Sequence, residues 1–132
     1  MDMSLERAET LIRRALAKAK QLGVPMNVAV LDGGGHLLAF ARMDGAFLGS
    51  IDIALKKAKT SVLFGMNTEA VGEFCRPGGP SPGLAATNDV LVVFPGGIPL
   101  KDEAGKVVGA VGVSGGLPEQ DHLVASAATA EA

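Results

Sequence analysis

The sequence predicts an α+β fold (α/β in the broad sense) in which one antiparallel sheet is flanked by helices. Two observations lead to this prediction. Segments with apolar residues at helical spacing alternate with short apolar segments that are typical of strands. Most links between neighbouring strands are short turns, which join antiparallel strands, whereas parallel strands need long crossovers. The 132 residues, of which 48% are hydrophobic, suit a single domain over residues 1–132.

The first predicted element is an amphipathic helix. Ser4 is a good N-cap residue because its hydroxyl can accept a hydrogen bond from a free backbone N–H of the first turn. Gly23 and Pro25 end the helix. The apolar stripe between these ends recurs at helical spacing and consists of Ala8, Ile12, Ala15, Leu16 and Ala19.

Two apolar strands follow as a hairpin, at residues 27–31 and 36–43, around the turn formed by Asp32 and three glycines. Both faces of the second strand are mostly apolar. A hairpin with one face in water alternates between apolar and polar residues, and this hairpin does not. Either helices or another subunit must cover both faces, and we expect a homo-oligomer.

The middle of the chain predicts a helix over residues 50–64, followed by a short helix and a long loop. Lys56, Lys57 and Lys59 fall mostly off the apolar stripe of the first of these helices. They either lie in solvent or, like an arginine, hold a carboxylate or a propionate. The loop contains three prolines and three glycines within residues 75–83, which excludes regular structure there.

Three further strands are predicted, at residues 90–94, at 98–100 and from Val107 onward, which brings the sheet to five strands. A helix begins at Pro118. One face of the last strand has almost no side-chain bulk and carries Ala110, Gly112, Ser114 and Gly116. Glycine in a strand marks close approach of another backbone or of a ligand. The sequence leaves both open: tight packing of a helix, or a ligand surface shared with the first hairpin.

The formal net charge of −2 argues against nucleic acid or an anionic membrane as the main partner, because both require a basic patch. Cys75 is the only cysteine, so no internal disulfide is expected. The N-terminal segment lacks the apolar core of a signal peptide, and no run of about 18 apolar residues occurs. We therefore expect a cytoplasmic protein.

Metal ligation has few candidates, because His36 and His122 are the only histidines and their spacing does not suit zinc. A haem iron needs only one or two axial ligands. Either histidine is a candidate ligand, and Met43 is a weaker one. Arg42 and Arg76 are candidates for holding a carboxylate or a propionate, since guanidinium pairs bidentately with carboxylates.

Four segments, VAVLDGGGHLLAFARMDGA, SIDIALKKAKT, FPGGIPL and VVGAVGVSGGLPEQD, resemble the GlcG/HbpS family of haem-binding domains. This domain also forms the C-terminal part of PduO-type corrinoid adenosyltransferases. The resemblance implies a profilin-like fold with a five-stranded antiparallel sheet, oligomers, haem binding and, for some members, oxidative haem degradation. The motif positions that it implicates are His36, Arg42, Met43, Asp44, Gly96, Gly97, Ser114, Gly115, Gly116, Gln120 and Asp121.

Three functions remain open at this stage. The first is binding of haem or of a related tetrapyrrole or corrinoid, with His36 or His122 on the iron and Arg42 or Arg76 on the propionates. The second is a small catabolic-operon enzyme, an isomerase, hydratase or lyase, in which Arg42 binds an organic acid and Asp121 or His122 is the acid or base. The third is an accessory subunit of a cofactor-dependent enzyme.

Overall fold

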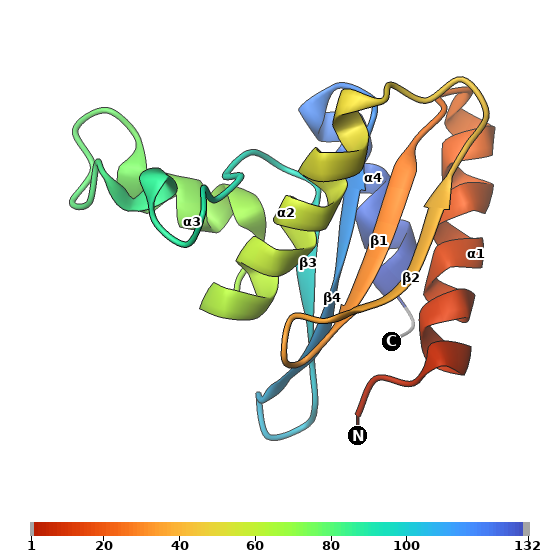
Figure 1. The fold of residues 1–132 in the computed structure, drawn as a ribbon, viewed down its shortest axis with the longest axis horizontal. Coiled ribbons are helices and arrows are strands. Elements are labelled where there is room, and N and C mark those ends of the chain that lie inside the picture. Colours follow the sequence, from red (N-terminus) through yellow and green to blue (C-terminus); the bar gives the residue numbers. More distant parts are fainter. Residues whose placement is uncertain (1, 131–132) are drawn as a thin grey trace.

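A computed structural model describes residues 2–130 and shows an α+β fold with a four-stranded antiparallel sheet (Figure 1). The strand order is β2-β1-β4-β3. In chain order the elements are α1 (Leu5–Leu22), β1 (Asn27–Asp32), β2 (Leu37–Arg42), α2 (Gly49–Phe64), α3 (Thr68–Cys75), the short 3-10 helix η1 (Leu84–Ala86), β3 (Gly97–Lys101), β4 (Val107–Ser114) and α4 (Pro118–Thr129).

The prediction of a fifth strand at residues 90–94 is wrong. This segment is irregular, and residues 88–90, the last of which begins it, have φ angles of 53°, 56° and 73°. Three successive left-handed residues turn the backbone away from an extended path. The N–H of Val92 donates to the side-chain hydroxyl of Thr60, at 3.3 Å, instead of to a neighbouring strand. The apolar sequence suited a strand, but the chain there packs on α2 as a loop.

The ends of α1 follow the prediction. The Ser4 hydroxyl accepts the N–H of Arg7 at 3.1 Å, and Gly23 closes the helix with a φ of 73°. The buried stripe consists of Ala8, Leu11, Ile12, Ala15 and Ala19. Across residues 2–130, no helix combines the length and apolar character needed to cross a membrane.

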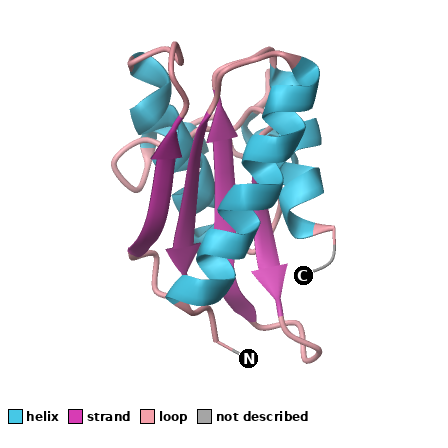
Figure 2. Ribbon diagram, turned by 90° about the vertical axis from the view of Figure 1, so that its right-hand side faces the viewer, coloured by secondary structure: helices cyan, strands magenta, loops and turns pink. Residues whose placement is uncertain are grey.

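Helices of the same chain cover both faces of the central strands. Helix α1 lies across one face (Figure 2), where α4 packs beside it. Helix α2 packs on the other face, against β1, β3 and β4. Side chains alternate between the two layers as the pleat requires. The α1 and α4 layer contains Val28, Val30, Val111 and Val113, and the α2 layer contains Ala29, Leu31, Ala54, Ala58 and Ala110.

The small side chains of β4 serve this packing. A Cβ atom added to Gly112 would collide with the backbone carbonyl of Ala54 and would crowd Ala58, both on α2. The backbone of α2 therefore lies directly against the backbone of β4 at Gly112, with no room for a side chain between them. Of the two interpretations of this face, close packing of a helix is confirmed, and a ligand surface over Gly112 is wrong.

Candidate functional site

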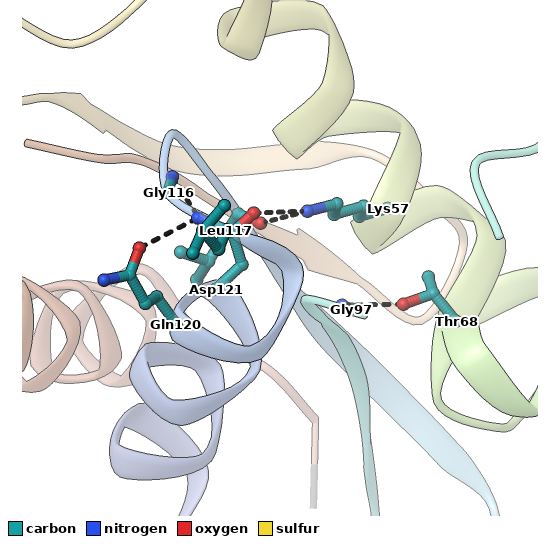
Figure 3. A network of polar contacts seen from close by, with 8 residues as sticks. Lys57, Thr68, Gly97, Gly116, Leu117, Gln120 and Asp121 are labelled. Atoms are coloured by element: carbon teal, nitrogen blue, oxygen red, sulfur yellow. Dashed lines mark hydrogen bonds and ion pairs between the residues drawn. The ribbon is translucent and has the colours of Figure 1, made fainter. Parts of the chain in front are cut away.

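A buried ion pair lies where the glycine-rich turns meet α2 and α4 (Figure 3). The Lys57 Nζ lies 2.9 Å from the Asp121 Oδ2 and donates to the carbonyl of Val113 at 2.8 Å. The Lys57 side chain is 0% exposed and that of Asp121 is 3% exposed. The ring of Phe94 covers the ammonium group, with its centroid 4.8 Å from Nζ.

The second carboxylate oxygen of Asp121 fixes the turn before α4. Its Oδ1 accepts the N–H of Gly116 at 2.8 Å, and the Gln120 Oε1 accepts the N–H of Leu117 at 2.9 Å. These side chains occupy N–H groups that a helix start would otherwise offer to an anion. The turn and α4 are thereby tied to Lys57 (Figure 3).

Burial sets the electrostatics of this pair. Loss of hydration lowers the pKa of Lys57, and the neighbouring Asp121 carboxylate opposes that shift. Loss of hydration also raises the pKa of Asp121, while Lys57 and the N–H groups of Gly116 and Gly115 act in the opposite direction. Each charge is stable only because the other faces it, as in other buried ion pairs. In this arrangement both Asp121 oxygens are occupied by the protein itself.

The motif glycines pack around the pair. A Cβ on Gly96 would meet the Lys57 Nζ at 2.6 Å, and one on Gly115 would meet the Pro25 carbonyl oxygen at 2.6 Å. The N–H of Gly97 donates to the Thr68 hydroxyl at 3.0 Å. The structure thus brings together one group of the predicted site residues at one end of the sheet: Gly96, Gly97, Ser114, Gly115, Gly116, Gln120 and Asp121.

His36 lies at the other end of the sheet, after the β1–β2 turn. Its side chain is 79% exposed, and its Nδ1 lies 3.1 Å from the Asp32 Oδ1. The same oxygen accepts the N–H groups of Gly34 and His36, each at 2.9 Å. Hydrogen bonding by the His36 N–H is the main reason why the pKa of Asp32 is lowered. The carboxylate therefore holds one ring nitrogen of an exposed imidazole.

His122 is held between helices. Its Nδ1 lies 3.5 Å from the Glu69 Oε2 on α3, and its Nε2 lies 3.3 Å from the Ser126 hydroxyl on α4. The side chain is 37% exposed. The Nδ1 is buried without a hydrogen-bond partner and the Nε2 lies beside Ser126, so His122 offers less access to an iron than the more exposed His36 does.

Of the remaining candidates, Arg42 lies at the Ser114 end of the sheet, because it pairs with Asn27, which pairs with Ser114 on its other side, whereas Arg76 follows α3. Arg42 is exposed at the far end of β2 from His36, roughly 20 Å away at about 3.3 Å per residue. It lines an open groove of about 520 Å³ with Lys20 and Asp44. The Met43 sulfur accepts the N–H of Met26 at 3.3 Å and is engaged in the fold. Arg76 is exposed beside Glu73, with 3.7 Å between the charged atoms.

The sequence did not single out two residues of the candidate sites, Lys57 and Asp32. Lys57 is fully buried, so of its two predicted settings the solvent-exposed one is wrong, and the carboxylate that it contacts is that of Asp121. Its spacing from Ala54 and Ser61, three and four residues away, is the one signal that places it on the inward stripe. Asp32 was seen only as a turn residue, although its position four residues before His36 across three glycines permits the contact.

Fold and site together define a small α+β domain with an exposed His–Asp pair at one end of its sheet and a buried Lys–Asp pair at the other. The chain belongs to the HbpS-like family: the family described as haem degrading protein HbpS-like matches residues 3–130. The resemblance carried by the four motifs is confirmed.

Known relatives extend over most of this chain. An uncharacterised 15.0 kDa protein from the dhaT-dhaS intergenic region of Citrobacter freundii is 42% identical over 127 residues, which are 96% of this chain and 89% of that protein. The corrinoid adenosyltransferase PduO of the same organism is 34% identical over 98% of this chain, which spans only 39% of PduO. A crystal structure of a PduOC–heme complex has a TM-score of 0.93 and 34% identity, covering 98% of this chain and 94% of that one.

Proposed function

We propose that this domain binds haem, or a related tetrapyrrole or corrinoid, with His36 as the axial ligand of the metal. The observation that carries this proposal is the contact between the His36 Nδ1 and Asp32, at 3.1 Å. Histidines that ligate metals usually donate their other ring N–H to a carboxylate, which fixes the tautomer and the ring orientation. The contact at Nδ1 orients the exposed His36 ring and leaves its Nε2 as the atom that would ligate the iron.

Further support comes from the surroundings of His36 and from a relative. The adjacent Leu37 is 53% exposed and offers apolar surface to a macrocycle. The PduOC protein, to which this chain is 34% identical, was crystallised as a complex with heme. Bound haem supplies a redox-active iron, whereas the chain supplies the axial ligand and its orientation. Degradation of haem and a cytoplasmic setting remain predictions.

Titration with haemin, followed by the Soret band, tests this proposal. We expect the wild type and His122→Ala to shift the band alike, because the His122 Nδ1 is buried and its Nε2 lies 3.3 Å from the Ser126 hydroxyl. His36→Ala should lose the shifted band, and Asp32→Asn should weaken binding by about 10- to 100-fold through loss of the orienting carboxylate. An unchanged spectrum and affinity in His36→Ala would overturn the assignment of the ligand.

The other two functions remain predictions with less support. An acid–base role for Asp121 toward a substrate held by Arg42 would require Asp121 to leave Lys57, which lies 2.9 Å away in the buried pair. His122 would have to leave Glu69. An accessory role alongside a cofactor-dependent enzyme needs an apolar contact surface. The exposed Phe47 and Leu48 would suit it.

A further inference from the structure

The two hairpin turns at the His36 end of the sheet have the same construction. Asp32 begins the turn between β1 and β2, and Asp102 begins the turn between β3 and β4. The Oδ1 of each aspartate accepts the backbone N–H groups two and four residues further along, at 2.9 to 3.0 Å. The glycine three positions after the aspartate has a φ of 84° in one turn and 85° in the other. His36 stands where the second turn has Lys106, so the turn itself does not require a histidine.

The first turn differs from the second in making room for an imidazole ring. Its second position after the aspartate is Gly34, whereas the second turn has Ala104 there. A Cβ on Gly34 would meet the His36 Nδ1 at 2.9 Å, so the ring can lie against the turn only because this residue is glycine. In this position the Nδ1 lies 3.1 Å from the Asp32 Oδ1 and 3.3 Å from its Oδ2. The turn therefore brings the ring onto the carboxylate.

The contact determines which nitrogen of the ring carries the proton. A carboxylate only accepts hydrogen bonds, so the Nδ1 of His36 is the donor, and in the neutral ring the lone pair stays on Nε2. Donation to an anionic acceptor raises the basicity of the other ring nitrogen. The two N–H groups that Asp32 also accepts fix its carboxylate in place. Nε2 is thus a more electron-rich ligand than the imidazole of a histidine without such a partner.

The charges around the turn act in the same direction. A cavity of about 440 Å³ beside the turn is lined by two carboxylates, those of Asp2 and Asp32, and by one ammonium group, that of Lys106. The sum of these charges is negative. A negative surrounding stabilises a metal ion of higher charge more than one of lower charge. Hydrogen bonding to the axial ligand and nearby charge are two of the means by which a protein sets the reduction potential of haem.

We infer that Asp32, acting through His36, makes this site selective for a tetrapyrrole whose metal is oxidised, and so for ferric over ferrous haem. The inference rests on the proposed function, because it takes His36 as the axial ligand. Asp32 is a positioning residue here, since it reaches the metal only through the ring. Asp32→Asn keeps an oxygen acceptor for the turn but removes the charge, so it should lower the ratio of ferric to ferrous affinity by about tenfold.

Potentiometric titration of the haemin-loaded protein, with protein in excess and the Soret band as the signal, tests this selectivity. A tenfold lower ratio of affinities raises the midpoint potential of a one-electron couple by about 59 mV. Asp102→Asn is the matched control, because it removes the same charge from a turn of the same construction, and it should keep the wild-type potential. An unchanged potential in Asp32→Asn, or an equal rise in both variants, would overturn the inference.

The position of the proton in the metal-free protein provides a second test, which needs no change to the turn. Long-range nitrogen–proton correlation NMR distinguishes an imidazole protonated on Nδ1 from one protonated on Nε2. In mildly alkaline buffer we expect the proton of the His36 ring on Nδ1. His36→Gln assigns the signals of this ring against those of His122. A ring that carries its proton on Nε2 would overturn the inference.

These experiments separate the inference from the proposed function. Haemin binding that is lost in His36→Ala, together with a potential that does not respond to Asp32→Asn, refutes the selectivity and leaves the proposed function intact. Haemin binding that is unchanged in His36→Ala overturns the proposed function, and the selectivity with it. Binding that depends on His36, a proton on Nδ1 and a raised potential in Asp32→Asn alone would support both.

Discussion

At the scale of single residues, the buried charge of Lys57 determines how much free energy of unfolding is lost when Asp121 is changed. Asp121→Asn preserves the shape and the acceptor for Gly116 but removes the charge that faces the Lys57 ammonium. Breaking a buried pair in this way costs about 3–5 kcal/mol, because the remaining charge is left without compensation. We expect urea denaturation of Asp121→Asn to give a free energy of unfolding lower by this amount.

The double variant Lys57→Met/Asp121→Asn is the control for this prediction. It removes both charges, so much of the loss should be recovered. A single variant within about 1 kcal/mol of the wild type would show that the pair is not fully desolvated. The sequence could not predict this pair, because its members are 64 residues apart and three lysines within four positions are typical of a solvated face. The sequence did name His36 as a candidate ligand, and its contact with Asp32 is local, because the two residues are four positions apart.

At the scale of elements, the contact between α2 and β4 depends on Gly112. A valine there would drive its Cβ into the carbonyl of Ala54, and neither backbone can move without breaking its own hydrogen bonds. We expect Gly112→Val to lower the free energy of unfolding by about 3 kcal/mol or more, measured by thermal and chemical denaturation.

Gly49→Ala is the matched control, because an added Cβ at Gly49 has no neighbour within 4 Å and this position begins α2. It should stay within about 1 kcal/mol of the wild type. Equal effects of the two substitutions would show that α2 does not lie on the strand as described.

The helices and the first hairpin were predictable because their signals are local: the Ser4 cap, the Gly23 stop and the glycine turn after Asp32. The predicted strand at residues 90–94 failed because strand formation depends on an available partner. Its apolar side chains suit a strand, yet β3, which follows it, already pairs with β4 and ends the sheet. Nothing in the sequence of residues 90–94 indicates that no strand is available for them to pair with.

At the scale of the whole molecule, the chain divides into a body, in which the sheet lies between α2 and the pair α1 and α4, and a projecting arm. Figure 1 shows α3 and the loop that follows it extending away from the sheet. The backbone hydrogen bonds of the arm are local, such as those from Gly79 to Arg76 and from Ser81 to Phe74. Strand β4, by contrast, is paired on both sides and is buried from Val108 to Ser114. Stability should therefore be distributed unevenly along the chain.

Hydrogen–deuterium exchange measured by mass spectrometry checks this distribution. Amides of β4 should exchange only through global unfolding, which costs about 5–15 kcal/mol for a domain of this kind. Amides of residues 77–90 should exchange far faster, because opening a local turn breaks few contacts. Peptides from α1, capped at both ends and buried along one stripe, provide an internal reference for the body. Protection of the arm equal to that of β4 would mean that the arm does not open locally and unfolds only together with the body.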